Sequence, residues 1–374
     1  MLNKKVLQVV NIPFVLPYFF GDQVEFLKEN NLDIMVACSS GRELDEFCQK
    51  YGIPKFELKV LRKVAPWTDL VSLFRLIVLM RREKFQYVCG HTPKGALLAM
   101  LSAKLAGVKH RVYFRHGIVF ETTVGLKFKL MLFLERLTCF CATKVVSVSK
   151  SVEFVSNELK INPERKNVLL NNGTCNGVDI RRFSVKKNKA HSRQTIDPDS
   201  FVVGFVGRLV NDKGINELID AWKMVLMSIP KAKLLLVGPY EERDSLSETT
   251  KQYIESDPSI VFTGLVTDTV GLYEEMDVFI LPSYREGFPT VVLEASLMQL
   301  PIITTRSTGC VDSIVENHTG IFTDIEPKGI AQSILYYYNN PDLRTTHGLN
   351  GRTWVKNNFN QRIVWEQLLS KVYN

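Results

Sequence analysis

Two stretches of the sequence place charged side chains where they could bind a phosphorylated substrate. The first, GFVGRLVNDKG (204–214), puts Arg208 and Lys213 in a loop that follows an apolar strand pattern ending at Gly207. A guanidinium binds phosphate oxygens in pairs and an ammonium acts as a point charge, so two cations in one loop suit a diphosphate. A solvated loop with a surface ion pair is the alternative, but Gly207 allows close backbone approach to a ligand and favours the diphosphate site.

The second stretch, EGFPTVVLEA (286–295), carries two glutamates around a turn and a helix start. Pro289 suits the first turn of a helix, whose free N–H groups form an anion site. Glu286 lies beside this helix start and offers acceptors for sugar hydroxyls, while Glu294, one to two turns further on, suits a ribose diol. The competing interpretation is a favourable charge at a helix start and a solvated helix residue. The helix around Glu294 is mostly apolar, however, so a charge there needs a partner or a cleft.

Strand and helix patterns alternate along the chain, which is typical of parallel sheets covered by helices. In the first half we expect strands at 6–10, 33–39, 87–91, 111–117 and 144–149, and helices at 23–31, 43–52, 70–84, 94–106 and 128–142. In the second half we expect strands at 201–207, 232–238, 260–266, 278–283 and 301–305, then a helical tail with a glycine break near 348–351. The pattern predicts an α/β chain of two doubly wound, Rossmann-like domains that face a central cleft, where ligands bind.

The polar segment SVKKNKAHSRQTIDPDS (184–200) is the best candidate for a linker between the domains. Its composition is polar and charged, with almost no apolar residues, as is usual at domain boundaries. We therefore expect domains at 1–185 and 200–355, and a C-terminal helix at 356–374 that packs back on the first domain.

The charge of the 374-residue chain is uneven. Residues 1–183 carry a net +12 and the remainder −4, which together give the net charge of +8. Basic residues mixed with apolar helices fit an anionic membrane surface better than nucleic acid. No stretch reaches the roughly 18 uncharged apolar residues that a spanning helix needs. The seven cysteines have no metal-ligand spacing and are expected to be buried free thiols in a reducing cytoplasm.

Taken together, GRL…KG, EGFPTVVLEA and PIITTRSTGCVDSIVENHTGIF resemble the retaining nucleotide-sugar glycosyltransferases of family four, which have the GT-B fold. In the first half, HTPKGALLAMLSAKLAGVKHRVYFRHG and LLNNGTCNGVDIRRF are similar to the branch that builds bacterial capsule, O-antigen and related surface glycans. The resemblance covers most of the chain, and E-x7-E in this context is a specific signal. Many relatives carry a glycine pair after the first strand, whereas NIPFVLPYFFG has only Gly21, which leaves the role of that loop open.

The resemblance implies roles for individual residues. Arg208 and Lys213 would hold the donor diphosphate, Glu286 would contact the transferred sugar and Glu294 would bind the ribose. His116, in RHG at a strand end, matches the histidine that contacts the donor sugar near the reacting centre, although a lone histidine serves structure as often as chemistry. The implied catalytic residues are His116, Glu286, Arg208 and Lys213. The implied donor-binding residues are Arg208, Lys213, Glu286, Gly287, Phe288, Pro289, Thr290, Val291 and Glu294.

The acceptor-side candidates lie at strand ends of the first domain, which the resemblance makes the acceptor-side, membrane-facing domain. They are His91, Thr92, Lys94 and Arg115, with a helix cap as the alternative role for Thr92. The acceptor would be a lipid-linked saccharide. The enzyme would then be cytoplasmic and peripherally attached to the inner face of the plasma membrane through the basic, apolar helices at 70–84 and 126–142.

The implied reaction is front-face substitution with retention of configuration, in which the leaving diphosphate helps to remove the acceptor proton. Arg208 and Lys213 would stabilise the growing negative charge, so no metal and no other cofactor is expected. The only D-x-D, Asp197-Pro198-Asp199, falls in the predicted linker. The donor of this hexosyltransferase is expected to be a UDP-hexose or UDP-N-acetylhexosamine, with a guanosine donor as the rival.

Other readings of the same fold remain. A dehydrogenase would need G-x-G-x-x-G after a strand, which the chain lacks. A phosphorylase commonly needs a lysine-bound pyridoxal group and a longer chain. A nucleotide-sugar epimerase would need no acceptor, and a non-catalytic partner subunit would need none of the four charged residues Arg208, Lys213, Glu286 and Glu294.

Overall fold

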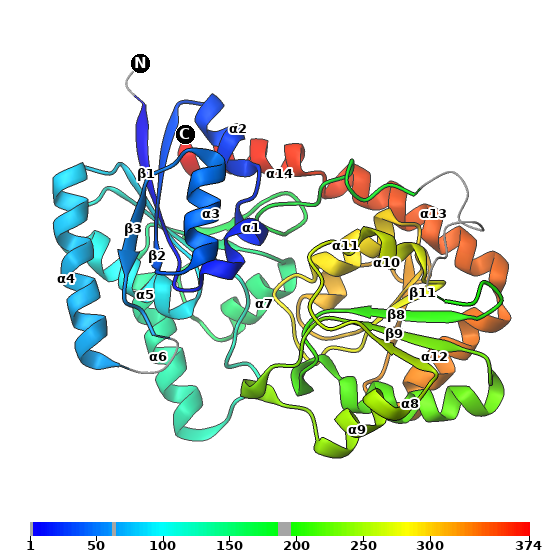
Figure 1. Cartoon of the computed structure of the whole chain (residues 1–374). Helices are drawn as coiled ribbons and strands as arrows, with labels where there is room; N and C mark the ends of the chain where they lie inside the picture. Colours follow the sequence, from blue (N-terminus) through cyan, green and yellow to red (C-terminus); the bar gives the residue numbers. More distant parts are fainter. Residues whose placement is uncertain (1–2, 62–64, 186–195) are drawn as a thin grey trace. The chain divides into compact units, whose positions relative to one another are not determined.

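The computed structural model describes residues 3–61, 65–185 and 196–374, which form two α/β units (Figure 1). The first unit comprises residues 1–177 and 361–374, and the second comprises residues 178–360. Each unit contains one parallel sheet, and both sheets have the doubly wound strand order of Rossmann-like domains. The predicted fold class is therefore confirmed. Within the described residues, no helix is both long enough and apolar enough to cross a bilayer.

The first unit is built on a seven-stranded sheet with the order β3-β2-β1-β4-β5-β6-β7. The chain starts in the middle, at β1, and winds outward first to one side and then to the other. Its strands are β1 (Lys4–Val9), β2 (Leu32–Ser39), β3 (Lys55–Leu58), β4 (Tyr87–Gly90), β5 (His110–Arg115), β6 (Lys144–Ser147) and β7 (Asn167–Leu169). Its helices are α1 (Leu16–Phe19), α2 (Gln23–Glu29), α3 (Arg42–Tyr51), α4 (Pro66–Glu83), α5 (Pro93–Leu105), α6 (Gly125–Cys141), α7 (Lys150–Glu158) and α14 (Gln361–Leu368).

Alternating residues of β1 point to the two faces of this sheet. Leu7 and Val9 belong to the apolar core beneath α4, α5 and α6, which pack side by side. Gln8 points the other way, toward the face where the C-terminal segment Leu369–Tyr373 lies. Helix α14 packs on α2, with Trp365 against Phe26 at 5.6 Å between ring centroids. The C-terminal segment is thus part of the first unit (Figure 1).

The second unit is built on a six-stranded sheet with the order β10-β9-β8-β11-β12-β13. Helices α8 and α12 pack together, as do α11 and α13. The strands are β8 (Val202–Val206), β9 (Lys233–Val237), β10 (Ile260–Phe262), β11 (Val278–Leu281), β12 (Ile302–Thr305) and β13 (Gly320–Thr323). The helices are α8 (Ile215–Ser228), α9 (Glu248–Ser256), α10 (Val270–Glu274), α11 (Thr290–Leu297), α12 (Pro327–Asn339) and α13 (Pro341–Asn358).

The unit boundaries differ from the expected ones. The chain enters the second unit at Val178, ahead of the expected linker, whose residues 186–195 lie outside the described residues. Val178 forms a β-bridge with Asn360, and Phe183 packs on Tyr273 at 6.0 Å between ring centroids. These contacts attach the segment before the predicted linker to the second unit. At the other end, the chain returns to the first unit at Gln361, five residues after the expected start at 356.

The glycine break predicted near 348–351 is wrong, because α13 runs unbroken from Pro341 to Asn358. Gly348 lies in the middle of this helix, where a β-carbon would overlap the carbonyl oxygen of Gln299. The glycine therefore serves close packing of α13 against the turn between α11 and β12. Glycine is a poor helix former, but the tertiary contact decides the outcome here.

Gly348→Ala is expected to destabilise the protein by about 1 to 3 kcal/mol, because the added methyl group overpacks the contact with Gln299. The matched control is Gly351→Ala in the same helix, where a β-carbon would lie at an ordinary 3.4 Å from Ser296. This control should be neutral or slightly stabilising, since alanine favours helix more than glycine does. Thermal unfolding of the two variants and the wild type measures the difference. Equal melting temperatures for the two variants would contradict the packing argument.

Candidate active site

The two predicted motifs of the second unit lie at the carboxyl ends of neighbouring strands. Arg208 and Lys213 follow β8, and the loop with Glu286 follows β11, which pairs directly with β8. The chain leaves β8 toward β9 on one side of the sheet and reaches β11 on the other, so this is the point where the winding direction reverses. Ligands of open parallel sheets bind at such points, outside the carboxyl ends of the strands.

Both cations of the β8 loop are paired with carboxylates. The Lys213 ammonium forms an ion pair with Glu286, and both side chains are largely buried. The Arg208 guanidinium is about half exposed and pairs with Glu241, which lies beyond the end of β9. Leu209 and Tyr240 bridge the loops after β8 and β9, which places Glu241 beside Arg208. The two cations of the site are thus each paired with one carboxylate. An incoming diphosphate would replace these carboxylates as the partner of the cations.

A further set of contacts, which the sequence did not predict, ties the β8 loop to the β11 loop. The backbone carbonyl of Asp212 accepts hydrogen bonds from the Tyr284 N–H (2.9 Å) and the Ser283 hydroxyl (3.0 Å). The Asp212 carboxylate pairs with Arg285. These partners are more than 70 residues apart in the chain, so no local sequence pattern predicts their contacts. Their effect is to hold Lys213 and Glu286 next to each other.

Close backbone packing at this site requires glycine at two positions. Gly309 has φ +79°, and a β-carbon there would lie 2.7 Å from the carbonyl oxygens of Glu286 and Gly287. Gly214 has φ +67°, and a β-carbon there would overlap the carbonyl oxygen of Pro282. Any larger residue would push the Glu286 loop away from the strand ends.

The segment between Glu286 and α11 matches its prediction in outline. Helix α11 starts at Thr290, and Pro289 is the residue that precedes it, one position earlier than expected. The Glu286 N–H donates to the carbonyl oxygen of Thr308 (2.9 Å). The Phe288 ring packs against Phe359 at 5.2 Å between centroids, so this side chain supports the unit's core.

Glu294 is enclosed by protein and is not a solvated helix residue. The hydroxyl of Tyr273, which is 0% exposed, donates a hydrogen bond of 2.8 Å to the Glu294 carboxylate. Burial raises the pKa of Glu294 from its ordinary 4.5 to about 7, although the Tyr273 hydrogen bond and the charge of Arg182 oppose this rise. A carboxylate that is costly to bury and held by a single hydroxyl has acceptor capacity for a further ligand.

The raised pKa of Glu294 predicts a pH-dependent effect of Glu294→Gln on stability. Between pH 4.5 and 7 the folded state holds the proton more tightly than the unfolded state, so the contribution of Glu294 to stability falls as the pH rises through this window. The neutral glutamine keeps an acceptor for Tyr273 and escapes this loss. The variant should therefore gain melting temperature relative to wild type at pH 8 but not at pH 4.5. A melting-temperature difference that is the same at both pH values would show that Glu294 does not titrate in this window.

In the first unit, His116 lies at the carboxyl end of β5. Its ring stacks on Phe19 with 3.8 Å between ring centroids, and its Nε2 lies 3.0 Å from Nδ1 of His91. Burial lowers the pKa of His116 to about 3, so the ring is neutral. A small cavity of about 40 Å³ is lined by Thr92, Pro93, Tyr113, Phe114, His116, Gly117 and Val119.

Two of the acceptor-side candidates are buried and cannot contact an acceptor directly. Arg115 is 0% exposed and forms an ion pair of 3.0 Å with Glu135. Successive residues of a strand alternate between the two faces of the sheet, so the Arg115 side chain points into the unit, where Glu135 is its partner. His91 is 2% exposed and its two ring nitrogens bond to protein groups. The predictions for these two residues are therefore wrong.

Thr92 and Lys94 are also engaged within the unit. The Thr92 hydroxyl donates to Asn11 Oδ1 (2.6 Å) and makes no cap bond to α5, so the alternative role as a helix cap is also wrong. Thr92 has φ +63°, a strained conformation for a β-branched residue. The Lys94 ammonium donates to the carbonyl oxygen of Leu61 (2.8 Å) and pairs with Asp69 at 2.7 Å.

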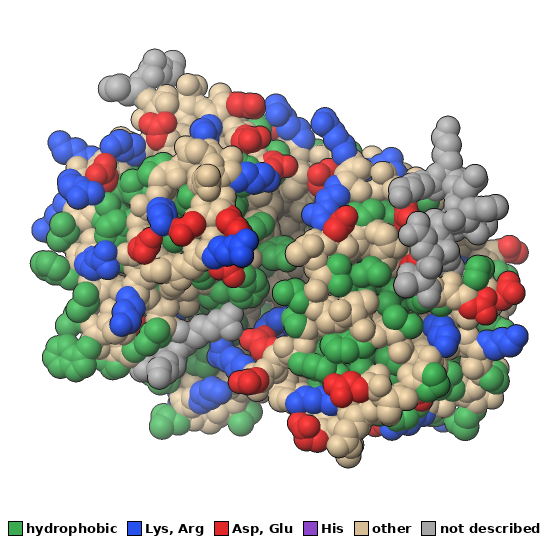
Figure 2. All heavy atoms as spheres, in the orientation of Figure 1, with side chains coloured by type: hydrophobic (Ala, Val, Ile, Leu, Met, Phe, Trp, Pro, Cys, Tyr) green, Lys and Arg blue, Asp and Glu red, His purple; other side chains and the backbone are tan. Residues whose placement is uncertain are grey.

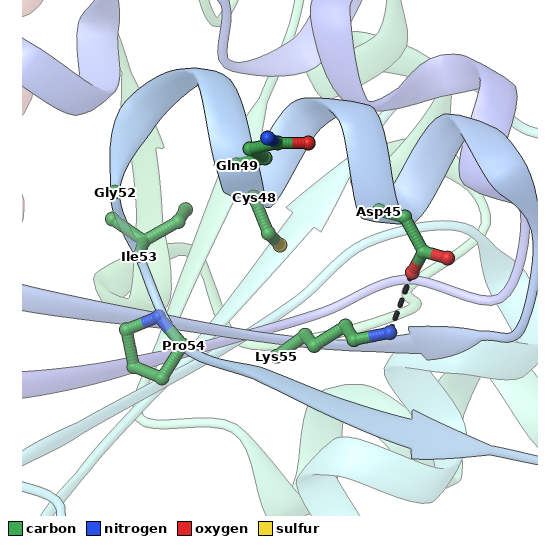
Figure 3. Close-up of a pocket in the computed structure, with 7 residues that line it drawn as sticks. All are labelled: Asp45, Cys48, Gln49, Gly52, Ile53, Pro54 and Lys55. Carbon is green, nitrogen blue, oxygen red and sulfur yellow. Dashed lines mark hydrogen bonds and ion pairs between the residues drawn. The ribbon is translucent and has the colours of Figure 1, made fainter.

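A larger hollow of about 350 Å³ lies between the C-terminal end of α3 and the start of β3 (Figure 3). It is open, and its Lys55 ammonium is already paired with Asp45 (2.5 Å) and Glu57 (2.7 Å). Because β3 begins at Lys55, the hollow lies at the amino end of that strand, away from the carboxyl edge where ligands bind. We therefore assign it no part in the site.

Two Rossmann-like units, with cations and glutamates at the switch point of the second sheet, define the chain as a GT-B protein. Residues 7–149 match the family described as "Glycosyl transferase 4-like", and residues 186–354 match "Glycosyl transferases group 1". The chain is 34% identical to the capsular polysaccharide biosynthesis glycosyltransferase CapM of Staphylococcus aureus, over 100% of this chain and 98% of the relative. The chain belongs to this family of glycosyltransferases, as its motifs indicated.

More distant relatives and solved structures agree with this assignment. An Escherichia coli enzyme named UDP-Gal:alpha-D-GlcNAc-diphosphoundecaprenol alpha-1,3-galactosyltransferase is 28% identical over 77% of this chain and 75% of its own length. The crystal structure of Anabaena HepE in complex with UDP and glucose has a TM-score of 0.81 at 16% identity, covering 100% of both chains. Sucrose-phosphate synthase from Thermosynechococcus elongatus has a TM-score of 0.79 at 17% identity, covering 99% of this chain and 98% of its own. At these identities the structures support the fold alone.

Proposed function

We propose that this glycosyltransferase moves a hexose or N-acetylhexosamine from a UDP-sugar to a lipid-linked saccharide, with retention of configuration, during the synthesis of a bacterial surface polysaccharide. The observation that carries the proposal is the grouping of Arg208, Lys213 and Glu286 at adjacent strand ends, with Glu294 held on the helix that follows. The printed names of relatives support the substrate classes. The E. coli relative is named for a UDP-galactose donor, and it and a Campylobacter jejuni relative (26% identical over 86% of this chain) are named for diphosphoundecaprenol-linked acceptors.

In this proposal each charged residue binds a different part of the donor. Arg208 and Lys213 bind the diphosphate and stabilise the negative charge that it gains on leaving. Glu286, once the diphosphate has replaced it at Lys213, accepts hydrogen bonds from sugar hydroxyls. Glu294 accepts hydrogen bonds from the ribose diol. The bond from the anomeric carbon to the diphosphate breaks, a bond to the acceptor oxygen forms on the same face, and the acceptor proton goes to the leaving diphosphate.

We propose that this transfer needs no metal ion, because Arg208 and Lys213 supply the positive charge. Asp197 and Asp199 come before β8 and so lie at its amino end, whereas the two cations follow its carboxyl end. An aspartate pair placed there is on the wrong edge of the sheet to bridge a metal to the diphosphate.

Nucleotide-dependent thermal stabilisation tests donor binding. The protein is heated with UDP, GDP, UDP-sugars and NAD, each with and without a chelator of divalent metals. A ligand at about 100 times its dissociation constant adds roughly 2.7 kcal/mol of stability if it binds only the folded state. We expect a shift with UDP compounds that the chelator does not change and that Glu294→Ala removes. A melting-temperature shift with GDP compounds alone would show that the donor is a GDP-sugar and not a UDP-sugar. A shift with NAD alone would overturn the proposal.

Product analysis then separates transfer from epimerisation. The UDP-sugars that stabilise the protein are incubated with and without lipid-linked saccharides, and the products are examined by NMR. The proposal expects UDP release only with an acceptor, and an anomeric configuration in the product equal to that of the donor. Interconversion of UDP-sugars without any acceptor would instead identify an epimerase on the same fold.

The membrane attachment that the proposal includes is assigned to α4 and α6. Both helices pack on α5 and expose large apolar side chains beside lysines and arginines, and Figure 2 shows green and blue side chains mixed over this part of the first unit. The exposed apolar side chains of these helices include Trp67, Leu70, Val71, Phe74, Val78, Leu126, Leu130, Phe133 and Phe140. Apolar side chains that enter the interface, with cations beside them, suit an anionic lipid surface.

Binding to vesicles with and without anionic lipid tests this surface. The paired changes Phe74→Glu and Phe133→Glu are expected to abolish binding to anionic vesicles at low salt, since each replaces an exposed apolar ring by a charge. The control is Phe154→Glu on α7, a helix outside the group of α4, α5 and α6 that pack side by side; Phe154 is 65% exposed. Binding of the wild type should fall in high salt. Equal loss in the control, or no binding of the wild type at any salt, would refute the assignment.

A further inference from the structure

The ring of His116 is one end of a continuous chain of buried polar groups in the first unit. His116 Nε2 lies 3.0 Å from His91 Nδ1, and His91 Nε2 lies 3.0 Å from Oε1 of Gln8. The Gln8 side-chain amide donates a 3.0 Å hydrogen bond to the Tyr373 hydroxyl. That hydroxyl lies 3.3 Å from the sulfur of Cys89. The chain therefore connects β5, β4 and β1 with the last turn of the protein.

The direction of each hydrogen bond follows from Gln8. Because its Nε2 donates to Tyr373, its Oε1 must accept, and the donor is the Nε2–H of His91. Burial lowers the pKa of His91, so the ring is neutral and carries no second proton. Its Nδ1 is then an acceptor, and His116 must donate from Nε2. A neutral His116 has one N–H, so its Nδ1 carries the lone pair and lies 3.8 Å from the sulfur of Cys175.

We propose that Gln8, His91 and Tyr373 are positioning residues that hold His116 as the neutral Nε2–H tautomer, so that Nδ1 is the only ring atom that can accept a hydrogen bond from a hydroxyl of the transferred sugar. The sugar-contacting role of His116 is the one that the family resemblance implies, and this inference rests on that role within the proposed function. The Cys175 thiol is a weak hydrogen-bond donor, and burial raises its pKa to about 12, so it stays protonated. A sugar hydroxyl is the stronger donor for the same nitrogen.

Tyr373, in the C-terminal segment, holds the end of this chain of polar groups that is opposite to His116. Its side chain is buried, and its backbone carbonyl accepts hydrogen bonds from the Lys4 ammonium (2.7 Å) and the Tyr87 hydroxyl (3.0 Å). These bonds fix the last turn of the chain against β1 and β4. The return of the C-terminal segment to the first unit therefore sets the position of the hydroxyl that orients Gln8.

Two conservative variants test the proposal in the full-length protein. Tyr373→Phe removes the hydroxyl that orients the Gln8 amide, and Gln8→Met removes the amide at similar volume. Nitrogen-15 NMR of the histidine side chains reads the tautomer directly, with His116→Gln to assign the signal. We expect wild-type His116 to be the Nε2–H tautomer and both variants to give a mixture. The kcat for sugar transfer should fall in proportion to the fraction of the Nε2–H tautomer that is lost, up to about tenfold, the worth of one hydrogen bond, while the affinity for UDP is unchanged.

The matched control is Tyr51→Phe, which deletes the hydroxyl of a buried tyrosine on α3 that donates to Asp22 (2.8 Å), in the same unit but outside the chain of polar groups. It should leave both the His116 signal and kcat unchanged. An unaltered His116 signal in Tyr373→Phe and Gln8→Met, or a wild-type Nδ1–H tautomer, would overturn the proposal. So would a changed signal without a change in kcat. The NMR measurement needs neither donor nor acceptor, so it decides the tautomer even if the wild type transfers no sugar and the proposed function fails.

Discussion

Lys213→Ala is expected to lower the rate of sugar transfer by about 10² to 10³-fold, the usual cost of removing one preorganised group that stabilises charge in a transition state. The ammonium of Lys213 lies at the end of β8, in an ion pair with Glu286 and with little exposure to water. Its removal takes away a charge that, in the proposed reaction, stabilises the departing diphosphate, and it leaves the Glu286 carboxylate without its partner. Steady-state kinetics with the donor identified by thermal stabilisation gives kcat and kcat/KM for the variant.

Lys223→Ala is the matched control for this change. Lys223 lies on α8 in the same unit, and its ammonium forms a half-exposed pair with Asp220. Exposed pairs contribute little, so this variant should keep wild-type kinetics and stability. Arg208→Ala should also reduce kcat, because the proposed reaction assigns its guanidinium to the same diphosphate. A loss in Lys213→Ala that is confined to KM would mean that Lys213 contributes only to binding of the donor and not to the reaction.

The parts of the fold that the sequence predicts are those with strong periodicity or clear stops. The central strands β4 and β8 consist of apolar residues and glycine, and β1 is apolar from Val6 to Val9 except for Gln8. Gly52 ends α3 in the left-handed conformation that glycine favours. The strands β3, β7 and β13 were missed. Each lies at an edge of its sheet, is short and is only partly buried, so its residues do not show the apolar pattern of a core strand.

The site residues also fall into two groups: those that a local motif predicts and those whose roles depend on contacts with distant segments. The loop cations and the two glutamates were found because each lies within a short motif next to a strand end. The partners Glu241, Asp212 and Tyr273 were not found, because their roles depend on contacts between segments that are 21 to 73 residues apart. Arg115 shows the opposite error: its place next to His116 suggested a ligand, but the alternation of β5 turns it into the core. A motif therefore gives the residue types, and the sheet decides which of them reach a substrate.

Arg115→Ala is expected to destabilise the first unit by about 3 to 5 kcal/mol, because removing one partner leaves the Glu135 carboxylate buried and unpaired. The Arg115 guanidinium also donates to Ser156 Oγ (2.6 Å) and Asn162 Oδ1 (2.7 Å). The loss therefore reaches α7 and the segment that follows it. Urea unfolding measures the stability, and hydrogen exchange of peptides from residues 3–61 and 65–177 separates the first unit from the second.

Arg136→Ala is the control, since Arg136 is the exposed neighbour of Glu135 on α6 and should be nearly neutral. The double change Arg115→Met with Glu135→Leu removes both charges and should recover much of the stability, as buried ion pairs replaced by apolar side chains often do. An acceptor-binding residue would behave differently: Arg115→Ala would fold with wild-type stability and show a raised KM for the acceptor. The two outcomes differ in both stability and kinetics, so this substitution tests whether the arginine beside His116 serves the core or the substrate.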